Sequence, residues 1–156
     1  MKRIVGATAV VLLVVFAGAA SARTSGSETI HTTLFATTFP NKSGGVETYS
    51  GTFSASGTVS DTGTVTDQAR FGALKSPVVG VLQQVRTYSG AKGTLTLRCN
   101  ERLHPPGQTT TVETNTGNCV VREATGAYAG LKGSGKLTGT TNFGATPVTL
   151  QDTLVL

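Results

Sequence analysis

The stretch TGAYAGLKGSGKLTG, residues 125–139, is the part of the sequence that decides the fold class. It places five glycines around Tyr128, directly after an apolar segment. Inside a helix each Gly costs about 1 kcal/mol relative to Ala, so this density excludes a helix. The stretch instead predicts turns and kinked strand, where bulky residues would not fit. The turn positions that we expect are Gly126, Gly130, Gly133 and Gly135.

The rest of the chain reads as strands and turns. Residues branched at the β-carbon, Thr above all, recur with turn residues between them, and no helix-period segment of useful length is present. This pattern predicts an all-β chain. The strands that we expect cover residues 30–39, 46–60, 64–71, 78–89, 93–102, 109–113, 118–124, 136–142 and 148–156. Eight or nine short strands in one domain indicate a closed barrel or a sandwich.

The first 22 residues have the pattern of a cleaved signal peptide. Lys2 and Arg3 precede an apolar run that closes on Ala20-Ser21-Ala22, a small-residue cleavage site. A retained membrane anchor is the alternative, but the run is short for a membrane span and no second apolar stretch follows. We therefore expect a secreted or extracytoplasmic protein whose mature part, residues 23–156, is one domain without a membrane segment.

The basic residues are spread along the chain. The sequence has 13 basic and 8 acidic residues, and removal of Lys2 and Arg3 leaves 11 basic ones, a net charge near +3. These residues lack the clustering and the interleaved aromatic side chains that a nucleic-acid surface needs. We interpret them as solvated strand faces and expect no nucleic-acid partner.

The two cysteines are expected to form a disulfide. Cys99 and Cys119 both lie in the mature part, and oxidation is the default for thiols of an exported chain. Closing the loop of about 20 residues between them would stabilise the fold by roughly 3 kcal/mol. A metal pair or a nucleophilic thiol is the alternative, but two cysteines with only His104 nearby fall short of a closed zinc site. We expect neither a metal nor a cofactor.

Three carboxylates share the strand parity of apolar residues and are candidates for the interior. Asp152 is in phase with the leucines that flank it, Glu47 with Tyr49, and Glu123 with Cys119. An unpaired buried charge is costly, so each carboxylate must pair, be protonated, sit at a barrel mouth or line a polar cavity. For Glu47 and Glu123 the alternative is a strand end that reaches solvent. Asp152 is the sharpest candidate, and we expect it to be partly buried and paired or hydrogen-bonded.

One motif resembles a phosphate-binding loop and is rejected. Residues 130–136 read G-x-x-x-x-G-K, but Leu137 follows in place of the Ser or Thr that would hold Mg²⁺. The next residues are strand-like, whereas the motif requires a helix. The chain also lacks the G-x-S-x-G and H-E-x-x-H motifs and calcium-loop spacing, so no hydrolase is visible.

Two segments resemble a known family. The run GTLTL at residues 93–97 and the stretch ATGAYAGLKGSG at residues 124–135 are similar to signatures of exported bacterial proteins related to the allene oxide cyclase and dirigent barrels. The resemblance covers roughly residues 46–142. It implies an eight-stranded antiparallel barrel around an apolar cavity, in a superfamily whose members cyclise or steer reactive intermediates, often as trimers. Ala124 stands where the signature has Gly, and no catalytic residue of the plant cyclase has a matching position here.

Two functions follow as hypotheses. The first is a non-catalytic barrel that binds a small apolar ligand or serves a structural role in the cell envelope. The second is a cofactor-free cyclase or isomerase that confines a reactive substrate. They differ in whether a carboxylate with a tuned pKa reaches into a cavity. Small side chains dominate the strands and favour a filled barrel, so we rank binding or structure first. The resemblance also makes a homo-oligomer an expectation.

Overall fold

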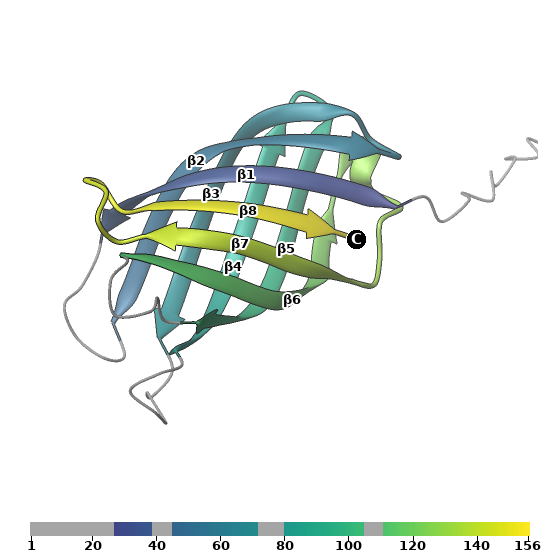
Figure 1. The fold of residues 1–156 in the computed structure, drawn as a ribbon. Coiled ribbons are helices and arrows are strands. Elements are labelled where there is room, and N and C mark those ends of the chain that lie inside the picture. The colour runs from purple at the N-terminus through teal and green to yellow at the C-terminus, as the bar shows by residue number, and fades with distance from the viewer. Residues whose placement is uncertain (1–26, 39–44, 72–79, 105–110) are drawn as a thin grey trace, which may run out of the picture.

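The chain forms one closed barrel of eight antiparallel strands (Figure 1). The computed structural model describes residues 27–38, 45–71, 80–104 and 111–156, so the expected signal peptide lies outside the described residues. The strands follow one another around the barrel in chain order, and β1 closes the wall by pairing with β8. The expected all-β barrel is confirmed. Its elements are β1 (Glu28–Thr38), β2 (Val46–Gly57), β3 (Asp61–Phe71), β4 (Gly80–Gly90), β5 (Gly93–His104), β6 (Val112–Ala124), the 3-10 turn η1 (Gly126–Tyr128), β7 (Ser134–Asn142) and β8 (Thr149–Val155).

β6 differs from the sequence prediction. The sequence predicts two strands, 109–113 and 118–124, whereas the described residues form one strand through both. Gly117, whose polar surroundings suggest a turn, pairs with Glu101 inside the β5–β6 ladder. A Cβ at Gly117 would lie 2.7 Å from the carbonyl oxygen of Asn100. The glycine is therefore required by close approach of the neighbouring strand.

Along the strands, buried residues that face inward alternate with exposed residues that face outward. On β5, for example, Leu95, Leu97 and Cys99 are fully buried while the residues between them face outward, as the sequence predicts. Phe53 and Tyr88 pack edge to face inside the barrel, with ring centroids 5.2 Å apart. Burial of each such side chain contributes about 1.5–3 kcal/mol, so this face holds the wall together.

One end of the barrel is closed by the short turns and η1; we call it the turn end, and the opposite end the loop end. At the turn end Asp61 accepts hydrogen bonds from the Lys92 backbone N–H and from the hydroxyl of buried Tyr128, both at 3.2 Å. Gly126 has a φ of +58° and Gly133 a φ of +100°, conformations that favour glycine. Gly135, by contrast, lies within β7.

Candidate functional site in the barrel interior

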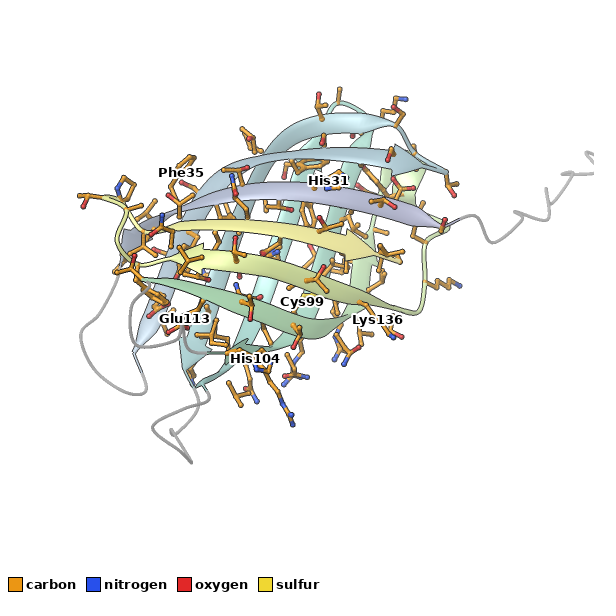
Figure 2. The ribbon with its side chains drawn as sticks, viewed as in Figure 1. His31, Phe35, Cys99, His104, Glu113 and Lys136 are labelled. Carbon is orange, nitrogen blue, oxygen red and sulfur yellow. A yellow bond between two sulfur atoms is a disulfide. The ribbon has the colours of Figure 1, made fainter. Side chains whose placement is uncertain are left out.

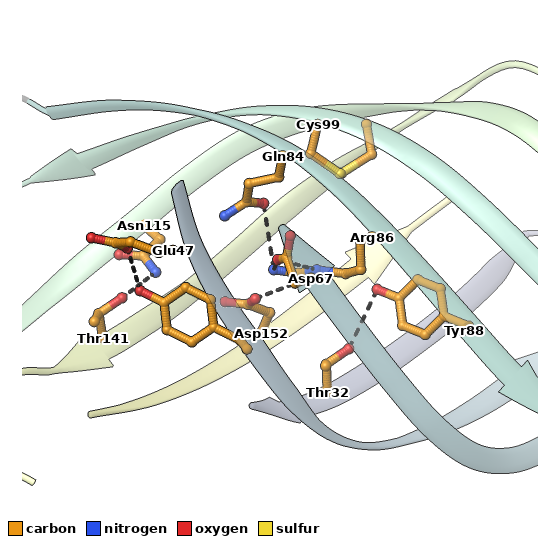
Figure 3. Close-up of polar contacts among 12 residues, drawn as sticks. Thr32, Glu47, Asp67, Gln84, Arg86, Tyr88, Cys99, Asn115, Thr141 and Asp152 are labelled. Carbon is orange, nitrogen blue, oxygen red and sulfur yellow. Dashed lines mark hydrogen bonds and ion pairs between the residues drawn. A yellow bond between two sulfur atoms is a disulfide. The ribbon is translucent and has the colours of Figure 1, made fainter. Parts of the chain in front are cut away.

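Arg86 on β4 lies at the centre of a polar cluster inside the barrel (Figure 3). Its Nη2 is 2.7 Å from Oδ2 of Asp67 on β3, and its Nη1 is 2.8 Å from Oδ2 of Asp152 on β8. Nε also donates to Asp67 at 2.9 Å, and Nη2 donates to Oε1 of Gln84 at 3.4 Å. All four side chains are buried. The guanidinium therefore links β4 to β3 and, through the interior, to β8.

The alternation of β4 explains why a charged residue is held there. Gln84, Arg86 and Tyr88 share the inward face of the strand with Leu82. The Tyr88 hydroxyl lies 3.4 Å from Oγ1 of Thr32, and its ring packs on Phe53. Burial raises the pKa of Asp67 even though Arg86 lowers it. Arg86 thus supplies the positive charge that opposes the effect of burial on Asp67.

Glu47 and Tyr49 on β2 form a second polar contact in the interior. The Tyr49 hydroxyl donates to Oε2 of Glu47 at 2.5 Å. Burial, with a smaller contribution from the charge of Asp67, raises the pKa of Glu47 to about 7, although the hydrogen bond from Tyr49 lowers it. Burial and the neighbouring carboxylates also raise the pKa of Tyr49. Tyr49 therefore remains a protonated hydrogen-bond donor at neutral pH. Glu47 gains or loses its proton close to pH 7.

Glu101 on β5 is the least satisfied member of the cluster. Its side chain is completely buried, and neither carboxylate oxygen has a hydrogen-bond partner. Burial and the charge of Asp152 raise its pKa to about 8, while Arg86 and the neighbouring Gln84 amide lower it. A buried polar group without a partner costs about 1–3 kcal/mol. With a pKa of about 8, Glu101 is mostly protonated at pH 7, and the amide of Gln84, whose Nε2 likewise has no hydrogen-bond partner, is its neighbouring donor.

More polar groups continue this lining towards the loop end. Asn115 on β6 donates to Oγ1 of Thr141 at 2.8 Å, while its own Oδ1 has no hydrogen-bond partner. Glu113 lies two residues further along β6 on the same side of the strand, is partly buried and has a pKa raised by burial. Glu47, Glu101 and Glu113 therefore give this part of the interior an excess of acidic groups.

The structure separates the three carboxylates that the sequence places inside. Asp152 is buried and paired with Arg86, which confirms the expectation of a buried and paired group. Glu47 is also buried, so its strand-end alternative is wrong. Glu123 is exposed, and the inward parity predicted for it is wrong. In the β5–β6 ladder Thr96 pairs with Glu123 but Leu97 pairs with Val121, so a bulge reverses the parity beyond Val121.

The expected disulfide between Cys99 and Cys119 is confirmed. The two cysteines are direct cross-strand partners on β5 and β6, and their sulfur atoms lie inside the barrel beside the polar cluster (Figure 3). His104, the one residue considered for a zinc site with them, is exposed and lies 3.0 Å from the Thr116 hydroxyl. A disulfide is consistent with the extracytoplasmic location that the sequence predicts.

Four members of the cluster were not singled out in the sequence: Asp67, Gln84, Arg86 and Glu101. The parity of β5 already contains a signal for one of them, because Glu101 continues the series Leu97 and Cys99. For Arg86 the signal is indirect: inward carboxylates require a cation from another strand.

The fold and the cluster define a closed antiparallel barrel with a charged interior. Within the described ranges no group of three His, Cys, Asp or Glu side chains could hold a metal ion, and no helix is long and apolar enough to span a bilayer. Comparison with protein-family models, with curated proteins and with solved structures finds no match for this chain.

Proposed function

We propose that this barrel binds a small amine with an apolar body, and that the ammonium group of the ligand lies against Glu101. Four carboxyl groups, those of Glu47, Asp67, Glu101 and Asp152, share the interior with the single guanidinium of Arg86. Arg86 pairs with the two aspartates. An ammonium ion supplies the positive charge that Glu101 lacks and donates up to three hydrogen bonds.

The observation that carries this proposal is the buried carboxyl group of Glu101 with both oxygens unpartnered. Next to it on the inward face lie Leu82, its register partner on β4, and Leu103, two residues along β5. Polar and apolar groups side by side in an interior are typical of sites for small molecules. The allene oxide cyclase and dirigent resemblance supports a ligand-holding barrel of this kind.

Calorimetry with hexylamine and hexanoate at pH 7 tests the proposal. We expect hexylamine to bind and to release close to one proton, because its charge lets Glu101 ionise; titrations in buffers of different ionisation enthalpy measure this release. Glu101→Gln should weaken binding at least about tenfold, since charge-assisted hydrogen bonds are worth about 1.5–3 kcal/mol. It should also abolish the proton release. The exposed Glu123→Gln is the matched control and should change neither quantity.

Equal binding of hexanoate, or unchanged affinity in Glu101→Gln, would contradict the proposal. A barrel that binds neither compound would support the structural role in the cell envelope.

A second candidate function is a cofactor-free cyclase or isomerase. The observation in its favour is the pair of interior acids with pKa values of about 7 for Glu47 and about 8 for Glu101. Such values suit a general base and a general acid near neutral pH. An allene oxide offered as substrate would then be converted to a ring product, and Glu47→Gln would lower kcat with little change in KM.

A further inference from the structure

The acidic and basic residues of this chain are segregated between the two sides of the barrel wall. Six of the eight acidic residues are buried: Glu28, Glu47, Asp61, Asp67, Glu101 and Asp152. Among the described basic residues only Arg86 is buried, while seven are exposed: Arg70, Lys92, Arg98, Arg102, Arg122, Lys132 and Lys136. The carboxylates that would neutralise these cations lie inside, so the outer surface is positive.

Strand register places four of the exposed cations in or beside a row of outward residues that runs half-way around the barrel wall, from β3 to β7. Arg70 on β3 is connected with Lys136 on β7 by successive register partners on the three strands between them, namely Gln83, Asn100 and Asn118. This row crosses four strand spacings of about 4.8 Å, or on the order of 19 Å. Arg98 and Arg102 stand two residues to either side of Asn100 on β5. We call these seven residues the basic band.

The basic band is hollowed and its cations are free to bind. A groove of about 630 Å³ is lined by Asn100, Arg102, Asn118 and Lys136, and a second groove of about 350 Å³ by Arg70, Gln83 and Arg98. In the part of the chain that the structure describes, both ion pairs involve Arg86, and none of the four cations of the band takes part in one. Lys136 points away from the barrel (Figure 2).

We propose that the basic band binds an anionic polysaccharide. The four cations match carboxylate or sulfate groups along a chain, and the amides between them can both donate to and accept from sugar hydroxyls. Single-stranded nucleic acid is normally held by aromatic side chains on which bases stack. The large exposed apolar residues that pair in register with the cations of the band are all valines, which cannot stack on bases: Val46, Val81, Val85, Val120 and Val155. Sugar polymers therefore fit the band better than nucleic acid does.

Binding of polygalacturonate, measured by biolayer interferometry in low and physiological salt, tests the proposal. We expect binding that weakens with salt, as it does when cations neutralise a polyanion. The double variant R98Q/R102Q should weaken it at least about tenfold. The matched control K92Q/K132Q removes the same charge at the turn end, outside the band, and should weaken it less than about threefold.

Equal losses in the two variants would overturn the proposal, because they would show attraction by net charge alone. Tighter binding of a single-stranded DNA of equal charge would also overturn it, and so would absence of polygalacturonate binding in low salt. Unfolding curves of both variants check that the exposed substitutions leave the fold intact.

Discussion

The ion pair between Arg86 and Asp152 joins β4 to β8, two strands that lie apart in the barrel wall. Backbone pairing links each strand only to its neighbours, so this contact and the one to Asp67 act as a brace through the interior. Burial of these charges costs free energy. The brace therefore stabilises the barrel only when Arg86 is paired with both aspartates.

Replacement of Arg86 by Met should be severely destabilising. Asp67 and Asp152 would be left in the interior without a cation, which costs about 3–5 kcal/mol when one partner of a buried ion pair is removed. Urea unfolding measures the loss. The exposed Arg98→Met is the control and should stay within about 0.5 kcal/mol of the parent protein. A loss below about 1 kcal/mol in Arg86→Met would contradict the brace.

The barrel should become more stable as the pH falls from about 8 to about 5. Glu101 and Glu47 have folded-state pKa values of about 8 and about 7, raised from 4.5. A carboxyl group with a raised pKa contributes stability that is full below the unfolded pKa and is lost as the pH rises through the folded pKa. Melting temperatures across this range measure the slope.

Two variants separate this slope from effects of the other acids. Glu101→Gln should flatten the dependence on pH, whereas Glu123→Gln should leave it as it is, because Glu123 is exposed. If both variants keep the parent slope, Glu101 is not the group responsible.

Reduction of the disulfide should lower the free energy of unfolding by roughly 3 kcal/mol, the value for a loop of this size. Cys99 and Cys119 are separated by 20 residues and are the only cysteines of the chain. Alkylation and mass spectrometry of the native protein should detect no free thiol. Two modified cysteines before reduction would show that the bridge is absent.

A methyl group at Gly135 should strain the contact between β7 and β8. A Cβ there would lie 2.2 Å from the carbonyl oxygen of Val155, so the backbone would have to move. We expect Gly135→Ala to cost more than about 1 kcal/mol in urea unfolding. Lys136→Ala, the next residue and exposed, should change stability by less than about 0.5 kcal/mol. If Gly135→Ala left the free energy of unfolding unchanged, the backbones of β7 and β8 would be able to move apart at that point without loss of stability.

Much of the fold follows from local signals in the sequence. The turn glycines Gly126 and Gly133 and the alternation around Leu95 and Leu97 are read from neighbours a few residues apart, and they hold in the structure, whereas the turn predicted at Gly135 is wrong because this residue lies within β7. Gly117 shows the limit of this reasoning. Its role depends on the backbone of Asn100, which is distant in sequence, and a local pattern interprets such a glycine as a turn.

The candidate site was less predictable because it depends on partners from distant strands. Alternation correctly placed Glu47 and Asp152 inside, but only the barrel brings Arg86 to Asp152. The prediction for Glu123 is wrong for a different reason. The bulge opposite Thr96 and Leu97 adds a residue to β6, and simple alternation along one strand does not reveal such a bulge.

The pairing of β1 with β8 can form only after the whole chain has been synthesised. Glu28 and Leu156 exchange backbone hydrogen bonds of 3.1 and 2.8 Å, so the wall closes between the first strand and the last. During synthesis a nascent chain that has reached only β7 has two open edges, and open edges are templates for pairing with other chains. The same missing strand carries Asp152, so Arg86 then also lacks one of its two carboxylates. Pairing of β8 with β1 therefore closes the wall and gives Arg86 its second carboxylate together, and until then both open edges must be kept from other chains.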